Sequence, residues 1–248
     1  MKKIISFLAV SSVFIVGCDS PGEANEKKTV HKVEEIEKPK EKAQKDESFL
    51  DIANELARNS EDIDDIYITD SLDIGEEEEF KPGIYDLEVT GGSGNIFGER
   101  KDFHNPYINW VAAAPNHDND YPSKIRMILF EGDELDFIDI SKVKFHAISE
   151  EVEPSNELGI GEFIVGRDIL PGDYKLSTKV KMNPEYDNLG WDITIVYVED
   201  EKTWDQTFTP ANNDVMVKLK EGEILSLSYN NTDYGTPSDD ARLVFNKK

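Results

Sequence analysis

Alternation of apolar and polar residues dominates the chain from about residue 67 onward. A strand that packs one face on a core places successive side chains on opposite faces, which gives a period of two. This period appears in Ile84–Thr90, Lys124–Phe130, Lys142–Ile148, Asp173–Met182, Trp191–Val198 and Val215–Leu219. Turn residues separate these segments, and short strands spaced in this way are typical of sandwiches and barrels. The pattern predicts an all-β fold.

The segment just before the strands has a helical pattern instead. Ser48 followed by Asp51 matches a capping box, and apolar residues recur at helical spacing over Phe49–Ala57. We therefore expect a short helix within a helix-and-linker segment at 48–66. Most amphipathic helices pack on their own domain, and a partner-binding helix is the alternative.

Two pairs of short motifs recur along the strand-rich region. Lys81-Pro-Gly-Ile-Tyr85 matches Leu170-Pro-Gly-Asp-Tyr174, and Glu131-Gly-Asp-Glu-Leu135 matches Glu221-Gly-Glu-Ile-Leu225. The glycines of the paired motifs are 49 residues apart in the first copy and 50 in the second. Pro-Gly suits a type II turn, so both motifs are interpreted as architectural. We expect two tandem antiparallel β-sandwich domains, at 67–150 and 157–248, each near a typical domain size.

The second copy resembles a known kind of module. Phe163–Tyr174 (FIVGRDILPGDY) is similar to the "VGxDIPAGxY" segment of β-rich repeat modules in surface proteins and lipoproteins of Gram-positive bacteria. Glu221–Leu225 occupies the place of their "xxGxxL" strand entry. The first copy departs from the pattern, because 76–83 reads EEEEFKPG where "VGxDI" would stand. The resemblance implies display and binding more than any reaction.

The N-terminus has the features of an export signal. Lys2 and Lys3 precede the apolar segment Ile4–Val16, which is too short to cross a membrane as a helix. Its end, Ile15-Val-Gly-Cys18, resembles the lipobox of bacterial lipoproteins. The resemblance implies a signal peptide at 1–17 cleaved after Gly17, and a diacylglycerol cysteine at Cys18 anchored on the extracytoplasmic face of the cell membrane. An ordinary signal peptide or a buried apolar segment is the alternative.

Composition adds a spacer and an electrostatic constraint. Residues 19–47 contain no aromatic residue and are dominated by Lys and Glu, so 18–47 is predicted to be a flexible charged linker. The whole chain has 27 basic and 52 acidic residues, a formal charge of −25. Nucleic acid is excluded as a partner because phosphate binding needs clustered Lys and Arg. Cationic partners or divalent metals are the electrostatically favoured ligands, and solubility at a cell surface is the simpler explanation.

No catalytic motif is present, so we expect no enzyme, no catalytic residue and no cofactor beyond the lipid on Cys18. This is the one cysteine in the sequence, which excludes an intramolecular disulfide. Asp118 and Asp120 offer oxygen donors for Ca²⁺, but their surroundings lack EF-hand spacing, and a solvated acidic loop without metal is the expectation.

Trp110 and Trp191 are the candidate ligand-binding residues, because exposed aromatic rings beside Asn and Asp stack on sugars. Core burial is the alternative for both. The leading hypothesis is a membrane-anchored surface lipoprotein that displays non-enzymatic binding or structural modules. A carbohydrate- or calcium-binding module of the cell envelope is the alternative. A surface protein and a glycan both remain open as the partner.

Overall fold

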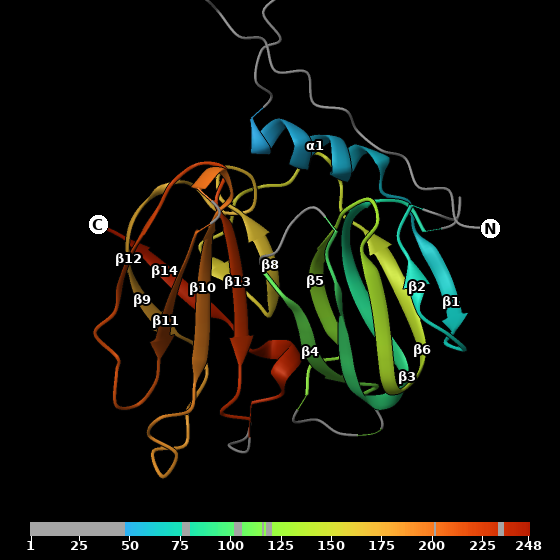
Figure 1. Cartoon of the computed structure of the whole chain (residues 1–248). Coiled ribbons are helices and arrows are strands. Elements are labelled where there is room, and N and C mark those ends of the chain that lie inside the picture. Colours follow the sequence, from blue (N-terminus) through green and yellow to red (C-terminus); the bar gives the residue numbers. More distant parts are fainter. Residues whose placement is uncertain are drawn as a thin grey trace, which may run out of the picture. The chain divides into compact units, whose positions relative to one another are not determined.

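A computed structural model describes residues 48–75, 80–101, 106–115, 117, 121–200, 202–232 and 236–248. The predicted signal peptide and linker, with Gly17 and Cys18, lie outside these residues. In the described part, one α-helix and fourteen strands form (Figure 1). The all-β class predicted from the alternation is therefore confirmed.

The helix α1 (Phe49–Asn59) begins where the capping box predicts it. The Ser48 side chain accepts a hydrogen bond from the Asp51 backbone N–H at 3.3 Å, and Asp51 Oδ2 accepts one from the Ser48 N–H at 3.3 Å. These bonds satisfy N–H groups that a helix start leaves without partners. The helix then buries its apolar side against the strands.

The first half of the strand region contains six strands. They are β1 (Ile63–Tyr67), β2 (Leu72–Asp73), β3 (Gly83–Glu99), β4 (Ile108–Ala113), β5 (Lys124–Leu129) and β6 (Glu134–Ala147). One layer has the antiparallel order β1-β6-β3-β5. The other has the antiparallel order β2-β6-β3-β4, so β3 and β6 serve both layers.

A bend in the two long strands makes this double use possible. The β3–β6 register shifts between Val89 and Asn95. Gly92 has φ +88° and the facing Asp139 has φ +60°. A Cβ on Gly94 would lie 2.0 Å from the Ile138 carbonyl oxygen, so the strands approach too closely there for a side chain. The glycines turn one ribbon into two packed layers.

The second half contains eight strands and two short 3-10 turns. They are β7 (Glu157–Leu158), β8 (Gly161–Ile164), β9 (Gly172–Thr178), β10 (Trp191–Tyr197), η1 (Val198–Asp200), β11 (Lys202–Phe208), β12 (Met216–Leu219), β13 (Ile224–Tyr229), η2 (Ser238–Asp240) and β14 (Leu243–Lys247). The antiparallel orders are β7-β14-β9-β12 and β8-β13-β10-β11. These orders match those of the first half strand for strand.

Contacts within the two halves also match. The Tyr85 hydroxyl donates to the Lys81 carbonyl at 2.9 Å, and the Tyr174 hydroxyl donates to the Leu170 carbonyl at 2.7 Å. Each ring meets a phenylalanine edge to face, Phe145 at 5.6 Å and Phe245 at 5.9 Å between centroids. The Pro-Gly-x-Tyr motif therefore places a core tyrosine in both halves.

The structure corrects the alignment of the "VGxDI" segment in the first half. Gly75 donates its N–H to the Phe80 carbonyl at 2.6 Å, as Gly166 does to the Ile169 carbonyl at 2.7 Å. Both glycines have positive φ, +87° and +98°. Ile74-Gly75 therefore stands where Val165-Gly166 stands in the second half, ahead of the run at 76–83.

The two halves are joined edge to edge. The strand β8 pairs in parallel with β5 at one point, Arg126 with Gly161, and so extends the first sheet into a ten-stranded sheet over the described residues. The chain from residue 48 on lies in one compact unit. Two separate sandwich domains are therefore not confirmed, since one sheet crosses the predicted boundary at 150–157.

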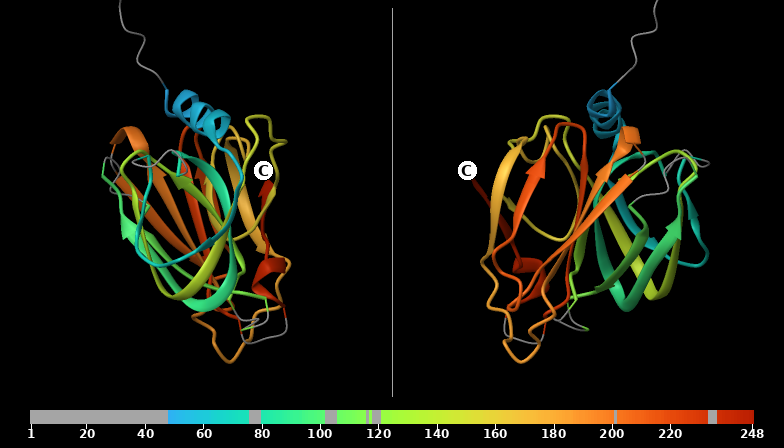
Figure 2. Two further views of the ribbon diagram at one scale, coloured as in Figure 1. Left: turned by 90° about the vertical axis from the view of Figure 1, so that its right-hand side faces the viewer. Right: turned by 60° about the vertical axis from the view of Figure 1, so that its left-hand side comes forward.

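The helix α1 covers the place where the halves meet, and it lies across the ends of the strands (Figure 2). Its buried Phe49, Ala53 and Ala57 share an apolar cluster with side chains from both halves. The members from the strands and turns are Ile84, Ile128, Phe130, Ile164, Val196 and Ile224. The prediction that this helix packs on the adjoining fold is correct.

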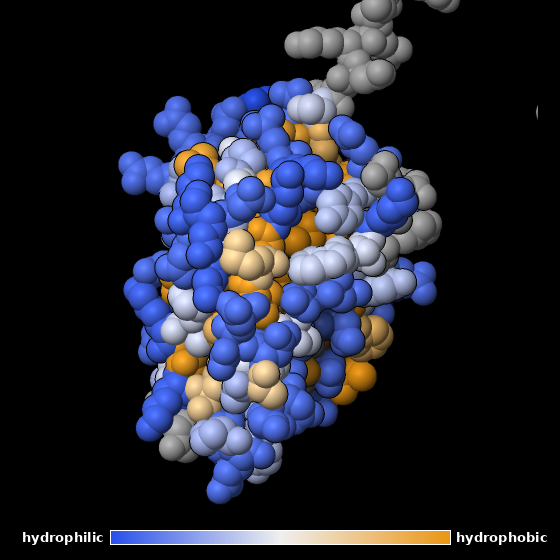
Figure 3. Space-filling view, turned by 90° about the vertical axis from the view of Figure 1, so that its left-hand side faces the viewer, coloured by the Kyte–Doolittle hydropathy of each residue, from blue (hydrophilic) through white to orange (hydrophobic). Residues whose placement is uncertain are grey.

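The other side of the second half ends in two edge strands, β11 and β12, each paired on one side. Figure 3 shows this side, where hydrophilic residues predominate and hydrophobic residues lie between them. Such a mixture is ordinary for a protein surface, because polar groups alone cannot cover it.

Replacing Tyr229 by Phe should stabilise the protein. Tyr229 is 6% exposed, and its hydroxyl has no hydrogen-bond partner among the described residues. Leaving a buried polar group unpaired costs about 1–3 kcal/mol, so we expect the Tyr229→Phe variant to gain about 1 kcal/mol at pH 7 in urea unfolding. The matched control Tyr174→Phe loses a bonded hydroxyl and should be destabilised.

The same residue makes the protein sensitive to alkali. Burial raises the pKa of Tyr229 to about 12. An unfolded tyrosine ionises near pH 10, whereas the buried one stays neutral until about pH 12. Below about pH 10 the free energy of unfolding is therefore unaffected by this residue's ionisation, and it falls as pH rises from about 10 towards about 12. The difference in urea midpoint between Tyr229→Phe and wild type should therefore be larger at pH 10.5 than at pH 7. The same midpoint difference at both pH values would contradict this prediction.

Candidate functional site

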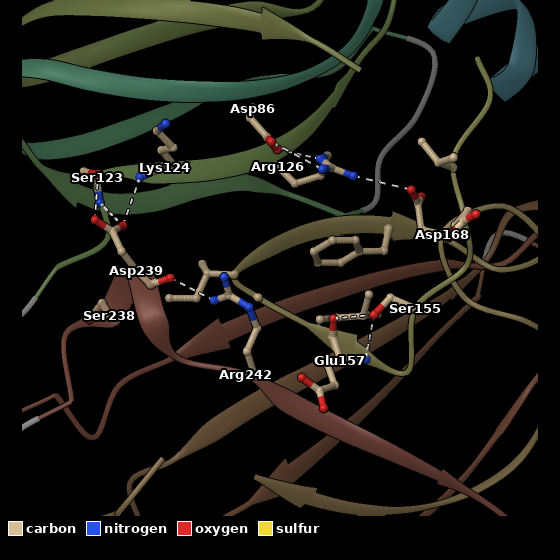
Figure 4. Close-up of a pocket in the computed structure, with 16 residues that line it drawn as sticks. Asp86, Ser123, Lys124, Arg126, Ser155, Glu157, Asp168, Ser238, Asp239 and Arg242 are labelled. Atoms are coloured by element: carbon tan, nitrogen blue, oxygen red, sulfur yellow. Dashed lines mark hydrogen bonds and ion pairs between the residues drawn. The ribbon is translucent and has the colours of Figure 1, made fainter. Parts of the chain in front are cut away.

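A cavity of about 710 Å³ lies at the junction of the two halves (Figure 4). The first half contributes side chains from β3 and β5. The second half contributes residues from the segment 152–160, Phe163 on β8, Asp168, η2, and Arg242 just before β14. Ligand sites often form where two structural units meet. This cavity is therefore the candidate functional site of the described residues.

Arg126 forms the wall on the side of the first half. Its Nε lies 2.5 Å from Asp86 Oδ1 and its Nη2 lies 3.3 Å from Asp86 Oδ2. Its Nη1 lies 3.4 Å from Asp168 Oδ1, and its guanidinium stands 5.5 Å from the Phe163 ring centroid. Two carboxylates and a ring hold this guanidinium in one orientation, because its planar fork bonds both partners at once.

Asp168 belongs to the second half and is 6% exposed. Burial raises the pKa of this carboxyl, while the hydrogen bond from the Ile164 N–H and the charges of Arg126 and Arg167 act in the opposite direction. The Ile164 N–H donates to Asp168 Oδ2 at 2.8 Å. Asp168 thus closes its own turn and also holds Arg126 across the junction.

Asp239 and Arg242 form the opposite wall. Asp239 Oδ1 accepts from the Ser123 N–H at 2.6 Å, and Oδ2 accepts from the Ser123 hydroxyl at 2.7 Å. Arg242 Nη1 donates to the carbonyls of Asp239 at 2.8 Å and Ala241 at 2.6 Å. Arg242 makes no ion pair with any residue that the structure describes, so its charge is available to a ligand.

Charged side chains of both signs line the cavity. Five acidic and three basic residues line the cavity, and neither His nor Cys is among them. The Ser123 hydroxyl is bonded to a carboxylate, whereas an activated serine needs an adjacent general base that is itself oriented. Fixed carboxylates and guanidinium groups with apolar patches between them can hold a small polar molecule by hydrogen bonds.

Trp110 and Trp191 do not line this cavity. Trp110 is 6% exposed and Trp191 is fully buried. The Trp191 Nε1 donates to Thr178 Oγ1 at 3.0 Å, and its ring packs against Tyr229 with centroids 5.0 Å apart. Neither ring presents a face for stacking on a sugar, which corresponds to the core alternative.

The other predicted site residues lie outside the described residues: Asp118 and Asp120, Cys18 and Gly17. Where the chain is described, no group of three or more His, Cys, Asp or Glu residues is arranged to hold a metal ion. No helix of that part is long and apolar enough to cross a membrane.

Sequence reasoning missed the four charged residues that shape the cavity: Asp86, Arg126, Asp168 and Arg242. One signal was present for Asp168, since it is the aspartate of the "VGxDIPAGxY"-like segment. Asp86 and Arg126 occupy ordinary strand positions, and Arg242 stands just before β14. The joint between β5 and β8 brings them to one cavity. Comparison of the chain with protein-family models, curated proteins and solved structures found no match.

Proposed function

We propose that this chain is a lipid-anchored surface protein of the extracytoplasmic face that displays two non-enzymatic β modules as one binding body. The lipobox-like Ile15–Cys18 and the charged segment after it support the anchor and the spacer. The observation that carries the binding role is the junction cavity, because both halves line it and neither half forms it alone.

The proposal includes two copies of one sandwich, at 67–150 and 157–248. Identical strand orders in the two halves support it, as do the matched tyrosine contacts and the matched glycine turns. In the first copy β3 and β6 run through both layers. In the second copy loops divide the corresponding strands into β9 with β10 and β13 with β14.

A joined pair suits a binding role because the joint holds the cavity walls in place. Arg126 from the first copy bonds Asp168 from the second, and Ser123 from the first copy bonds Asp239 from the second. Binding costs less when the groups that contact the ligand are already ordered. The proposed ligand of the cavity is a small polar molecule with an acceptor group for Arg242.

The anchor is tested by metabolic labelling with radioactive palmitate in an expressing bacterium. Wild type should be labelled and the Cys18→Ser variant should not, because the lipid is attached through the sulfur atom of Cys18. The Ser20→Ala variant is the matched control and should be labelled like wild type. Label on the Cys18→Ser protein would refute the anchor, whatever fraction of the protein sediments with membranes.

A further inference from the structure

An exposed apolar patch lies on the outer face of the first half. It consists of Phe97 on β3, Val111 on β4 and Ile138 on β6, which are 37%, 38% and 50% exposed. Asn95 of β3 pairs with both Val111 and Ile138, so these two lie on the same face. Phe97 is two residues further on and therefore also shares this face. The patch spans the three adjacent strands β4, β3 and β6.

The second half shows that the fold does not require this patch. Ile96 pairs with Trp110 and Phe137, and at the matching position Ile193 pairs with Gln206 and Leu227. The matching positions of the patch then follow from the register. Phe97, Val111 and Ile138 correspond to Thr194, Thr207 and Ser228.

The matching positions of the second half and the residues paired with them are polar, and further along the same face the apolar Val196 and Ile224 belong to the cluster beneath α1. Asp192 pairs with Thr207 and Ser228, and Thr194 pairs with Asp205 and Ser226. The same strand arrangement thus forms with hydroxyl and carboxylate side chains outward. The fold therefore does not need apolar side chains at the first-half positions, and a cluster of exposed apolar side chains is typical of a surface that contacts another molecule.

The surroundings of the patch indicate the chemistry of that molecule. Tyr107 is 76% exposed and lies just before β4, two residues from Asn109 on the same alternation. Asp136 pairs with Phe97, and Glu134 pairs with Glu99 at the end of the same strands. An apolar and aromatic centre with a polar border is typical of protein–protein interfaces.

We propose that this patch docks a partner protein whose own apolar contact surface is bordered by Lys and Arg. Charge complementarity selects this occupant. A second copy of the chain would bring Asp136 and Glu134 against the same residues, between two molecules of charge −25. Anionic lipid is disfavoured by the same charge. The docking surface is separate from the junction cavity and does not depend on ligand binding there.

The test exchanges the patch for its counterpart within the same chain. The triple variant Phe97→Thr, Val111→Thr, Ile138→Ser installs the residues with which the second half folds. The matched control Thr194→Ala, Thr207→Ala, Ser228→Ala alters the opposite half. Circular dichroism and urea unfolding establish that each protein is folded. The probe is a synthetic helical peptide with Leu on one face and Lys on the other, with fluorescence anisotropy as the readout.

Wild type and the control should bind the Leu/Lys peptide at least about tenfold more tightly than the patch variant, as loss of hot-spot side chains produces. Replacing Lys by Glu in the peptide, or Leu by Ser, should abolish this difference. Equal affinity of wild type and patch variant for the Leu/Lys peptide would overturn the proposal. So would patch-dependent binding of the Leu/Glu peptide, of phosphatidylcholine vesicles or of a soluble glycan, or patch-dependent dimerisation in sedimentation.

Discussion

Replacing Glu162 by Met should lower the free energy of unfolding by about 3–5 kcal/mol, because it removes the carboxylate that the buried Arg100 guanidinium hydrogen-bonds and leaves it, among the described residues, only Asp133 as an ion-pair partner, at 3.9 Å from Nε. Arg100 Nη2 lies 2.8 Å and 2.9 Å from the two Glu162 oxygens, and both side chains are almost fully buried. Glu162 Oε2 also accepts from the Ile128 N–H at 2.9 Å. The measurement is equilibrium urea unfolding of the variant and wild type.

A double-mutant cycle separates the pair from the loss of volume. Arg100→Met combined with Glu162→Met removes both charges and should cost clearly less than the sum of the two single changes. Glu157→Met is the control, because its ion pair with Lys179 is exposed and should matter by less than about 1 kcal/mol. Additive single effects would show that Arg100 and Glu162 do not act as a pair across the junction.

Replacing Gly161 by Ala should destabilise the joint between the halves by roughly 2–6 kcal/mol, since backbone strain and overpacking each cost about 1–3 kcal/mol. Gly161 has φ +130°, where side chains are rarely tolerated. A Cβ there would lie 2.4 Å from the Arg126 carbonyl oxygen and 2.5 Å from its nitrogen. Both obstacles are backbone atoms of β5, so β8 must move away from the first half.

The neighbouring Gly159 is the matched control, because the nearest atom to its Cβ would be Arg242 Nη1 at 3.4 Å. Gly159→Ala should unfold like wild type in urea. Gly161→Ala should lower the midpoint and broaden the transition, as the halves lose their common sheet. A wild-type midpoint and slope for Gly161→Ala would contradict the role assigned to this close approach.

The sequence was sufficient for features that depend on neighbouring residues. The period of two predicted the strand-rich region, and Ser48 with Asp51 predicted the start of α1. Pro-Gly before Tyr85 and Tyr174 predicted a type II turn at both sites, and this turn type was wrong, because Gly83 has no positive φ and Gly172, at φ +158°, is close to extended. Both tyrosines nevertheless make the same contacts. These signals are readable because pleat, cap and turn are set by side chains a few residues apart.

The alignment of the two halves was only partly readable. The segment from Gly75 to Phe80 is longer than the segment from Gly166 to Ile169. An alignment of the two halves that starts at their Pro-Gly pairs and runs backwards therefore places acidic residues opposite Val165 and Gly166. The backbone hydrogen bonds of Gly75 and Gly166 restore the match. A loop can gain residues without disturbing the strands it connects, and a register taken from spacing alone then shifts.

The sequence by itself thus determined the all-β class, the helix start, the acidic charge and the paired turn motifs. Only the tertiary structure decided that Glu162 meets Arg100, that Arg126 meets Asp168, and that Trp191 lies in the core while Phe97 lies outside. Each of these depends on which strand edges join and which face of a strand turns inward. Those choices follow from the path of the whole chain, and alternation along one strand is compatible with either face.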